Sequence, residues 1–174
     1  NVFSSGHNLK ELTAHRADTD KGARYFETVF ERCAEVMARI AQHRCAVIAE
    51  VDGLASAAGC QLVASCDMDY ASPRASFCTP GVNIGLFCST PMVAVSRALA
   101  PKHAMEMLLT GDVYDAAHAE RIGLINRVVA QNELSGFVAE LAARIASKSA
   151  SAIAHGKPLF YEQRMMNLHD AYDM

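Results

Sequence analysis

The stretch that decides the fold runs from Asp52 to Asp67 and reads D-G-L-A-S-A-A-G-C-Q-L-V-A-S-C-D. An apolar run over residues 46–51 leads into it, and an apolar helical pattern follows Gly59. This order predicts a strand, a tight turn and the start of a helix. Small side chains before Gly59 leave backbone amides open to a ligand, and amides at a helix N-terminus carry partial positive charge. The stretch therefore predicts an anion or oxyanion site, or simply close packing of a helix on a strand.

The composition limits the classes of protein that fit this chain. Its 174 residues are 51% hydrophobic and can bury one core, so we expect a single domain over residues 1–174. The net charge of -3, with scattered Lys and Arg, offers no basic field for nucleic acid or for an anionic membrane surface. No apolar run approaches the roughly 18 residues that a membrane span requires. We expect neither a nucleic-acid partner nor a membrane span.

The cysteines share apolar surroundings and form no C-x-x-C pair, which favours reduced, buried thiols over disulfides. They are Cys33, Cys45, Cys60, Cys66, Cys78 and Cys88. A thiol acts as a nucleophile only beside an activating group, and none is evident in the sequence. No cluster of His, Cys and carboxylates has metal-ligand spacing, so we expect no metal.

The periodicity of apolar residues places strands and helices in alternation. Three- and four-residue spacing predicts an amphipathic helix over residues 25–42, and Met68 to Ala71 alternates as a strand. Residues 77–91 are predicted to form a long connection punctuated by Gly and Pro. Further elements are predicted as helices at 92–99, 102–109, 116–122, 133–147 and 151–169, and as a strand at 124–129. Asp115 is expected to cap the helix at 116–122, and Gly123 to end it. The alternation indicates the α/β class.

Five segments of the sequence, taken in order, carry a resemblance to a known family. They read S-G-H-N-L-K-E-L, V-I-A-E-V-D-G-L-A-S-A-A-G-C-Q-L-V-A-S-C-D, F-C-T-P-G-V-N-I-G-L, A-M-E-M-L-L-T-G and A-E-R-I-G-L-I-N-R-V-V. With these landmarks in register, essentially the whole chain resembles the crotonase superfamily of enoyl-CoA hydratases and isomerases. The resemblance implies a ClpP/crotonase-like spiral of repeated ββα units with C-terminal helices. It also implies that the family's N-terminal ββ portion and C-terminal trimerisation helices are missing here.

The resemblance implies a site in which two backbone N–H groups hold the thioester oxygen of an acyl-CoA as enolate charge develops. By motif position, these amides belong to His7 and Ala58. The family's CoA-contacting run matches His7, Asn8, Leu9 and Lys10. Asn8 stands where Asp is usual, which removes a charge but keeps a turn-forming side chain. Implied as well are fatty acid metabolism, a mitochondrial location, a homotrimer or hexamer, and no cofactor other than the CoA of the substrate.

The acid and base of the family are where this sequence departs from the pattern. The two glutamates of family hydratases fall at Gln61 and Gly81, and family isomerases use the second of these positions. An amide has no accessible basicity near neutral pH, and glycine has no side chain at all. The sequence therefore predicts an enzyme of weak or altered chemistry or, alternatively, a non-catalytic acyl-CoA-binding or structural homologue.

Substitute groups for these glutamates lie nearby in the sequence. Glu50, Asp52 and Asp67 flank the central stretch, and a buried carboxylate can act as a base, although structural roles fit them better. His7 could carry a proton, but a turn histidine is expected to be exposed to solvent.

A peptidase is a further alternative, because the Clp-type serine proteases share the spiral scaffold. Their nucleophile would fall at Ala57, with Ser56 one residue early. A one-residue offset at a helix start points the side chain elsewhere, so we do not expect peptidase activity.

Overall fold

The computed structural model describes residues 1–174 and contains seven short strands. They are β1 (Val2–Ser4), β2 (Ile48–Val51), β3 (Leu54–Ser56), β4 (Met68–Ala71), β5 (Ser76–Cys78), β6 (Tyr114–Asp115) and β7 (Arg127–Val128). One sheet has the order β1-β3-β5-β6 and the other β2-β4-β7. All neighbours pair in parallel except β5 and β6, which are antiparallel.

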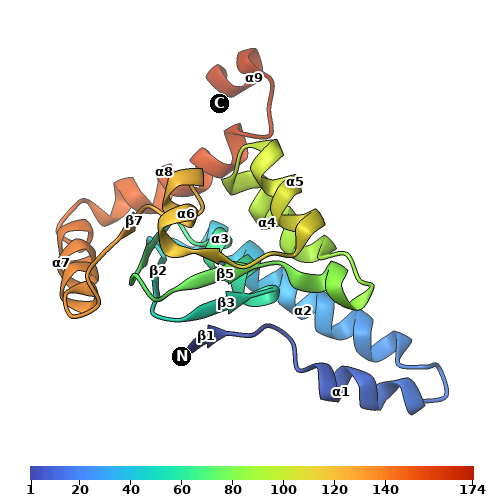
Figure 1. Ribbon diagram of the computed structural model, residues 1–174. Helices are drawn as coiled ribbons and strands as arrows, with labels where there is room; N and C mark the ends of the chain where they lie inside the picture. Colours follow the sequence, from blue (N-terminus) through green and yellow to red (C-terminus); the bar gives the residue numbers. More distant parts are fainter.

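Helices surround both sheets (Figure 1). The α-helices are α1 (Leu9–Ala14), α2 (Ala23–Gln42), α3 (Ala58–Ser65), α4 (Ser89–Ala98), α5 (Pro101–Thr110), α6 (Ala116–Ile122), α7 (Leu134–Ala146), α8 (Ala150–Gln163) and α9 (Leu168–Tyr172). Two 3-10 helices are η1 (His15–Ala17) and η2 (Pro80–Ile84). None of the helices is both long enough and apolar enough to cross a lipid bilayer.

From β1 to β5, consecutive strands alternate between the two sheets, and this alternation generates a spiral. β2 belongs to one sheet, β3 to the other, and α3 follows; β4, β5 and α4 repeat the pattern. The change of sheet between β2 and β3 takes place at Asp52 and Gly53. A Cβ on Gly53 would lie 2.8 Å from the carbonyl oxygen of Asn1, so glycine lets β1 approach closely. The predicted α/β class and ββα spiral are confirmed.

The core lies between the sheets and the helices α3, α4, α5 and α6. Its fully buried side chains include Val51, Phe77, Val95 and Met107. A second, smaller cluster packs α7 on β4 and contains Tyr70, Val129, Leu134 and Leu141. Because α3 packs against both α2 and α4, its N-terminus is held in a fixed place beside β1.

Several predicted elements are confirmed. β4 has the predicted bounds, and α2 covers the helix predicted at 25–42. α6 begins after Asp115, whose carboxylate accepts from the N–H of His118 at 2.7 Å, and it ends at Gly123 with φ +85°. Both caps could be predicted from the sequence because each depends on a single residue type that is preferred at that helix end.

Other predicted elements are wrong. The tight turn predicted after β2 contains β3, and the connection predicted over 77–91 contains the end of β5, all of η2 and the start of α4. The helix predicted over 151–169 ends at Gln163 and resumes as α9. Of the strand predicted over 124–129, only β7 forms. The missed strands have two or three residues, which is too short for alternation to be visible.

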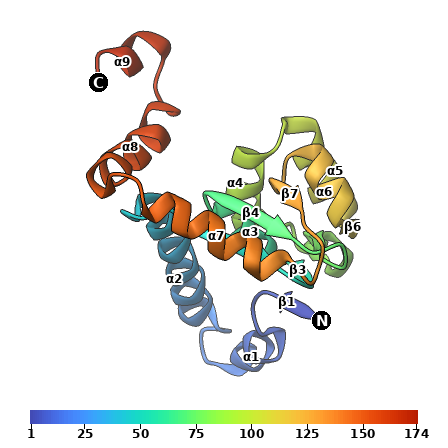
Figure 2. The same ribbon diagram turned by 90° about the vertical axis from the view of Figure 1, so that its left-hand side faces the viewer.

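The C-terminal helices α8 and α9 project from the body as an arm (Figures 1 and 2). The root of this arm is anchored by a buried ion pair, in which Lys157 Nζ lies 2.7 Å from Asp67 Oδ2. Further out, several large apolar side chains are exposed: Leu159, Phe160, Met165, Leu168 and Tyr172.

Candidate functional site

The turn after β1 meets the N-terminus of α3, and two glycines allow this contact. Gly6 has φ +84°, and a Cβ on it would lie 3.1 Å from the amide nitrogen of Ala58. A Cβ on Gly59 would lie 2.2 Å from the carbonyl oxygen of Ser4, closer than any real side chain. Glycine at both positions therefore brings residue 7 beside the first turn of α3.

Two backbone amides at this junction are free of protein acceptors. The N–H of His7 makes no hydrogen bond to backbone or side chain. Ala58 is the first residue of α3, so no carbonyl of that helix can accept from its N–H. The two predicted donors thus lie on adjoining segments at the positive end of a helix dipole.

The backbone is strained immediately before Ala58. Ala57 has φ 51° and ψ −114°, a conformation that costs a residue with a side chain about 1 to 3 kcal/mol. Its N–H donates to the carbonyl of Cys78 on β5 at 3.0 Å, and its carbonyl accepts from the N–H of Gln61 at 3.0 Å. These bonds hold the strained residue, so the direction of the next amide is fixed.

The side chain of His7 lies in a different environment from the one expected. Its ring meets Phe30 of α2 edge to face, with centroids 5.4 Å apart and an interplanar angle of 89°. The Nε2 atom is buried and has no hydrogen-bond partner in the protein. His7 as a whole is half-buried beside α2, so the expectation of a solvent-exposed turn histidine is confirmed only in part.

Gln61 and Gly81, the positions of the usual glutamates, are both occupied by groups that cannot transfer protons. Gln61 is buried on α3, and its Oε1 accepts from the thiol of Cys33 on α2 at 3.8 Å. Gly81 lies in η2, where its N–H donates to Sγ of Cys88 at 3.3 Å. A Cβ on Gly81 would lie 2.7 Å from the carbonyl oxygen of Leu86 and 2.8 Å from Cys88 Sγ. The turn over residues 82–88 thus fills the space that a side chain at 81 would need.

The residues matched to the CoA-contacting run lie on the surface where α1 begins. Asn8 caps this helix, since its side-chain oxygen accepts from the N–H of Lys10 at 3.2 Å. Asn8, Leu9 and Lys10 are all exposed. The substitution of the usual Asp by Asn therefore keeps the local cap.

The three flanking carboxylates all have structural partners. Glu50 accepts from the hydroxyl of Ser135, and Asp52 binds Arg74, whose guanidinium holds the pKa of that carboxyl below its usual range, with Ser72 assisting. Asp67 accepts from the hydroxyl of Tyr161 at 2.8 Å and from the N–H of Val47 at 2.7 Å, in addition to Lys157.

Asp69 is a buried carboxyl that sequence reasoning missed. It lies on β4, and its Oδ1 is buried without a hydrogen-bond partner. Burial, with a smaller contribution from the charge of Asp67, raises its pKa to about 8. An Asp among the apolar residues of a predicted strand is itself a signal, because unpaired Asp is rarely buried.

The thiols are only partly as expected. All six cysteines are free, and Cys60, Cys78 and Cys88 are buried, but Cys45 is exposed and the other two are half-buried. Burial raises the pKa of the Cys60 and Cys88 thiols, so both are poor nucleophiles. The expectation of wholly buried thiols is therefore wrong for Cys45, which lies on the connection between α2 and β2.

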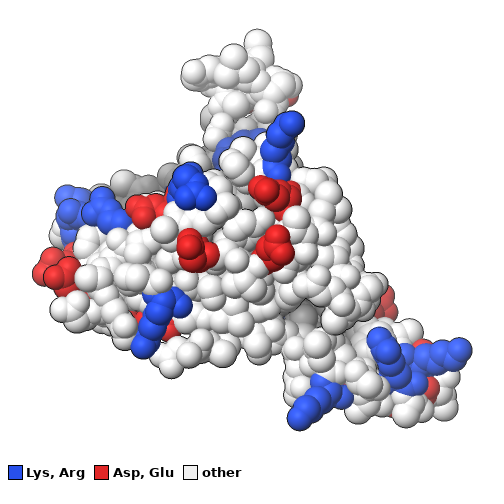
Figure 3. Space-filling model, in the orientation of Figure 1, with Lys and Arg blue, Asp and Glu red and all other residues white.

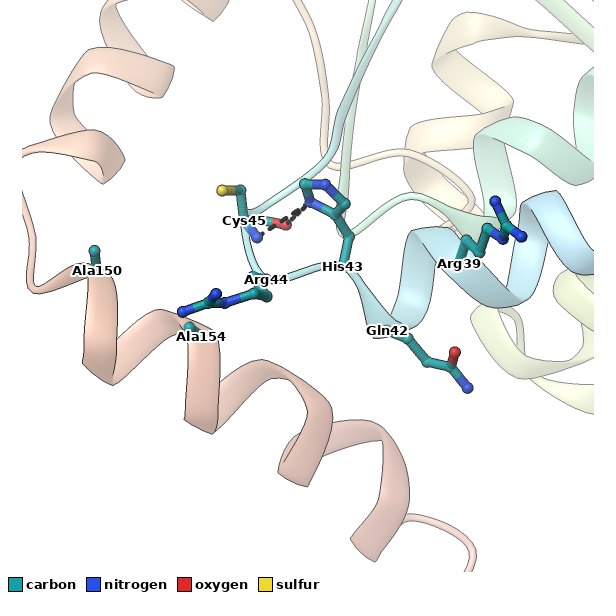
Figure 4. A pocket seen from close by; sticks show the side chains of 7 residues that line it. All are labelled: Arg39, Gln42, His43, Arg44, Cys45, Ala150 and Ala154. Atoms are coloured by element: carbon teal, nitrogen blue, oxygen red, sulfur yellow. Dashed lines mark hydrogen bonds between the residues drawn. The ribbon is translucent and has the colours of Figure 1, made fainter.

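One hollow of the molecule lies away from all these residues. It has a volume of about 630 Å³ and is lined by residues at the end of α2 and just after it and by Ala150 and Ala154 of α8. Of the side chains drawn, Arg44 extends toward Ala154 (Figure 4). It contains neither of the free amides nor the positions of the usual glutamates. The candidate site is instead the junction of β1, α3, α2 and η2.

Comparison with known proteins establishes the family. A model of the enoyl-CoA hydratase/isomerase family matches residues 1–173. The chain belongs to the enoyl-CoA hydratase/isomerase family. It is 52% identical over 171 residues to rat enoyl-CoA hydratase domain-containing protein 3, mitochondrial, and the match covers 98% of this chain and 55% of that protein.

Solved structures of the enoyl-CoA hydratase/isomerase family share the fold. The human enoyl coenzyme A hydratase domain-containing protein 3 superposes with a TM-score of 0.91 at 50% identity, over 98% of this chain and 65% of that chain. An enoyl-CoA hydratase from Mycobacterium smegmatis gives a TM-score of 0.92 at 43% identity, over 99% and 65%. The chain spans about half the length of the curated relatives it matches.

Proposed function

We propose that this family member binds an acyl-CoA thioester and holds its carbonyl oxygen between the N–H groups of His7 and Ala58. The observation that carries the proposal is the junction at which Gly6, Gly59 and the strained Ala57 bring these two amides together. The same donors would stabilise the enolate that forms when the α-carbon loses a proton. Donors preset for such a charge are commonly worth about 3 kcal/mol each.

The CoA moiety would extend over the start of α1. Lys10 is exposed there and can meet a phosphate, and Figure 3 shows Lys and Arg side chains on the surface of the α1 side of the molecule. CoA enters with the substrate, so the proposed chemistry needs no separate cofactor. The names of the similar rat, mouse and human proteins support a mitochondrial location for this chain. A role in fatty acid metabolism is part of the proposal and follows from the proposed acyl-CoA substrate.

The reaction that follows binding is proposed to be weak or altered relative to hydration or isomerisation. Neither Gln61 nor Gly81 offers a carboxylate. A specific observation also favours the second candidate, a non-catalytic acyl-CoA binder: Cys88 and Leu86 fill the space beside Gly81. The free amides fit both candidates, because binding and enolate stabilisation use the same donors.

Two matched ligands test the proposed carbonyl contact without changing the protein. Butyryl-CoA and its thioether analogue S-butyl-CoA differ in the carbonyl oxygen alone. We expect isothermal titration calorimetry to show binding of butyryl-CoA at least about tenfold tighter than of S-butyl-CoA, since two hydrogen bonds of about 1 kcal/mol each are lost. Equal affinities would contradict the assignment of His7 and Ala58, and no binding of either ligand would remove the proposal.

Product analysis separates the two candidate functions. We expect crotonyl-CoA to be hydrated slowly, with the product identified by mass spectrometry. Tight binding of a panel of acyl-CoA esters with no product from any of them would leave the non-catalytic binder in place and overturn the enzyme.

A homotrimer or hexamer is part of the proposal, and a structural observation supports it. The exposed apolar side chains of the α8–α9 arm, among them Phe160 and Leu168, would be covered in an assembly. Analytical ultracentrifugation tests this part separately, and a monomer at micromolar concentration would contradict it.

A further inference from the structure

Two hollows adjoin one another at the end of α2, away from the candidate site. The first is the hollow of about 630 Å³ beside α8, which we call the cationic hollow. The second has a volume of about 310 Å³ and is lined mostly by alanine and isoleucine side chains, so we call it the apolar hollow. Arg44, Cys45 and Ala150 line both hollows. Because these three residues are shared, a single ligand can occupy both, and each volume is within the range of small-molecule sites.

The charged side chains that line the two hollows are all cations. Arg39 and Arg44 line the cationic hollow, Arg44 and Lys148 line the apolar hollow, and no carboxylate lines either. None of the ion pairs of the chain includes any of these three side chains. The whole chain has a net charge of -3, so a group of cations without a counter-charge is unusual here. Its natural complement is an anionic ligand.

The connection that carries Arg44 is held in place by α8. Lys157 Nζ donates to the carbonyl oxygens of Ile40, on α2, and Cys45, at 2.7 and 3.0 Å. Nδ1 of His43 also accepts from the N–H of Cys45 at 3.2 Å. The backbone on both sides of Arg44 is therefore fixed relative to α2 and α8. A preorganised backbone lowers the cost of ordering the Arg44 guanidinium on a ligand.

The apolar hollow joins three isoleucines that the fold leaves half-buried. Ile48 begins β2, Ile145 lies in the last turn of α7, and Ile153 lies in the first turn of α8. An alkyl chain among these side chains would be removed from water. Each methylene group that is fully buried increases affinity about fourfold. A volume of about 310 Å³ is at the lower end of small-molecule sites, which favours a chain of medium length.

We propose that the two hollows form a second ligand site, which binds the carboxylate of a medium-chain fatty acid. The carboxylate lies against Arg44, because a guanidinium offers it two parallel hydrogen bonds, and Arg39 and Lys148 add positive charge. The alkyl chain lies among the isoleucines of the apolar hollow. The site shares no residue with the junction of His7 and Ala58, so it goes beyond the acyl-CoA binding proposed for that junction.

Three small ligands separate the charged head from the alkyl tail. Octanoate carries both, 1-octanol lacks the charge, and butyrate lacks four methylene groups. We expect isothermal titration calorimetry to show one equivalent of octanoate bound, and the other two ligands bound at least about tenfold more weakly. Equal affinities for octanoate and 1-octanol would overturn the role of the cations. Equal affinities for octanoate and butyrate would overturn the role of the apolar hollow, and no binding of octanoate would remove the site.

Arg44→Gln tests the head of the ligand. Arg44 is exposed and belongs to no ion pair, so the variant should fold normally. We expect its affinity for octanoate to fall at least about tenfold, the effect of losing hydrogen bonds to a charged group. Arg32→Gln is the matched control, since Arg32 is exposed on α2 and lines neither hollow. An unchanged affinity in Arg44→Gln overturns the proposed contact.

Ala142→Leu tests the tail of the ligand by filling the apolar hollow from an exposed position on α7. Leucine is a good helix former, so α7 should be retained. We expect the preference for octanoate over butyrate to disappear. Ala143→Leu, at the next position and lining neither hollow, should keep it. A preference unchanged in Ala142→Leu would mean that octanoate adsorbs elsewhere, such as on the exposed apolar side chains of the α8–α9 arm, and would overturn the proposal.

Cys45 reports the location of the ligand without any substitution. It lines both hollows and is the exposed cysteine of the chain. Octanoate at about ten times its Kd should slow alkylation of Cys45 by iodoacetamide about tenfold, measured by mass spectrometry of peptides. An unchanged rate overturns the location. Failure of any of these tests leaves acyl-CoA binding intact, and failure of butyryl-CoA to bind leaves this second site intact.

Discussion

The two ends of helix α3 differ in which groups form their contacts: backbone groups at the N-terminus and side chains beyond the C-terminus. At its N-terminus the features are made by the backbone: two glycines that admit no Cβ, a strained alanine and amides without protein acceptors. Beyond its C-terminus the features are made by side chains, where Asp67 binds Lys157, Tyr161 and the N–H of Val47. The first end is open to a ligand, whereas the second has its own partners.

The comparison shows that buried charge does not mark the proposed site in this protein. The most perturbed carboxyl, Asp69, and the buried ion pair both lie at the C-terminal end of α3. A search for perturbed carboxylates would therefore point to the anchor of the arm and away from the amides. Burial of a carboxyl in a structural region raises its pKa as burial in a catalytic centre does, so the geometry of donors is the better guide here.

The largest effect is expected from Gly59→Ala, which disturbs the backbone contacts at the N-terminal end of α3. A Cβ at residue 59 would lie 2.2 Å from the Ser4 carbonyl, so β1 and the Gly6 turn must move away from α3. We expect a loss of about 3 kcal/mol or more in the free energy of unfolding, measured in urea, and loss of butyryl-CoA binding. Gly136→Ala is the control: nothing lies within 4 Å of its added Cβ on α7, so stability should stay equal or rise. Full binding by Gly59→Ala would refute the backbone account.

Lys157→Ala removes one of the side-chain contacts beyond the C-terminal end of α3. Lys157 Nζ pairs with Asp67 and donates to the carbonyl oxygens of Ile40 and Cys45 at 2.7 and 3.0 Å. Removing one partner of a buried pair leaves a buried charge uncompensated, so we expect a loss of about 3 kcal/mol in urea unfolding. Lys102→Ala on the exposed face of α5 should cost less than about 0.5 kcal/mol. Since the amides are untouched, the folded variant should bind butyryl-CoA normally, and a parallel loss of affinity would show that the two ends are coupled.

The sequence predicts the two ends of α3 to different extents. The N-terminal end is encoded locally, because Gly6, the small residues before Gly59 and the register of the motifs identify the amides. The environment of side chains depends on contacts across the chain. Nothing near residue 7 indicates that Phe30 covers its imidazole, and nothing near residue 81 indicates that Cys88 occupies the vacated space. Such contacts join elements far apart in sequence, which periodicity and turn chemistry do not describe.

The same distinction applies to the fold. Caps at Asp115 and Gly123 depend on one residue each and were predicted. β3 and β5 have three residues each, and they form because a neighbouring strand is already in place. Likewise, neither a glycine nor a proline follows Gln163 directly, so no local sequence signal predicts that α8 ends there. Elements with local signals were therefore predictable, and elements stabilised by pairing were not.

Asp69→Asn tests the cost of the unpaired carboxyl. The pKa of Asp69 is raised from 3.8 to about 8 in the folded protein, so the folded state binds this proton more tightly than the unfolded state. The associated stability is complete below about pH 4 and is lost as pH rises to about 8. Between pH 5 and pH 8 the free energy of unfolding of the native protein should fall as Asp69 loses its proton. That of Asp69→Asn should fall by at least about 2 kcal/mol less, because an amide does not titrate in this range. Asp112→Asn, at an exposed site, should follow the native curve, and identical curves for all three proteins would show that Asp69 is not desolvated.

The smallest effect is expected from Gln61→Glu, which restores one carboxyl at nearly constant size. The new group would be buried against Cys33, so we expect a loss of about 1 kcal/mol in stability at neutral pH and little change in acyl-CoA affinity. Hydration of crotonyl-CoA should rise no more than about tenfold, because a positioned water still lacks the second acid–base group. Gln61→Met, which keeps the length without the charge, should give no increase.

A gain beyond about 100-fold from Gln61→Glu alone would show that another group already exchanges the α-proton. Adding Gly81→Glu should not produce such a gain by itself, since its Cβ meets Leu86 and Cys88. Combining both substitutions with Cys88→Ala provides part of the missing room. If only this triple variant hydrates crotonyl-CoA efficiently, the filled space at Gly81 is what separates this site from a two-carboxylate hydratase. If Gln61→Glu alone suffices, the filled space at Gly81 is not what limits hydration.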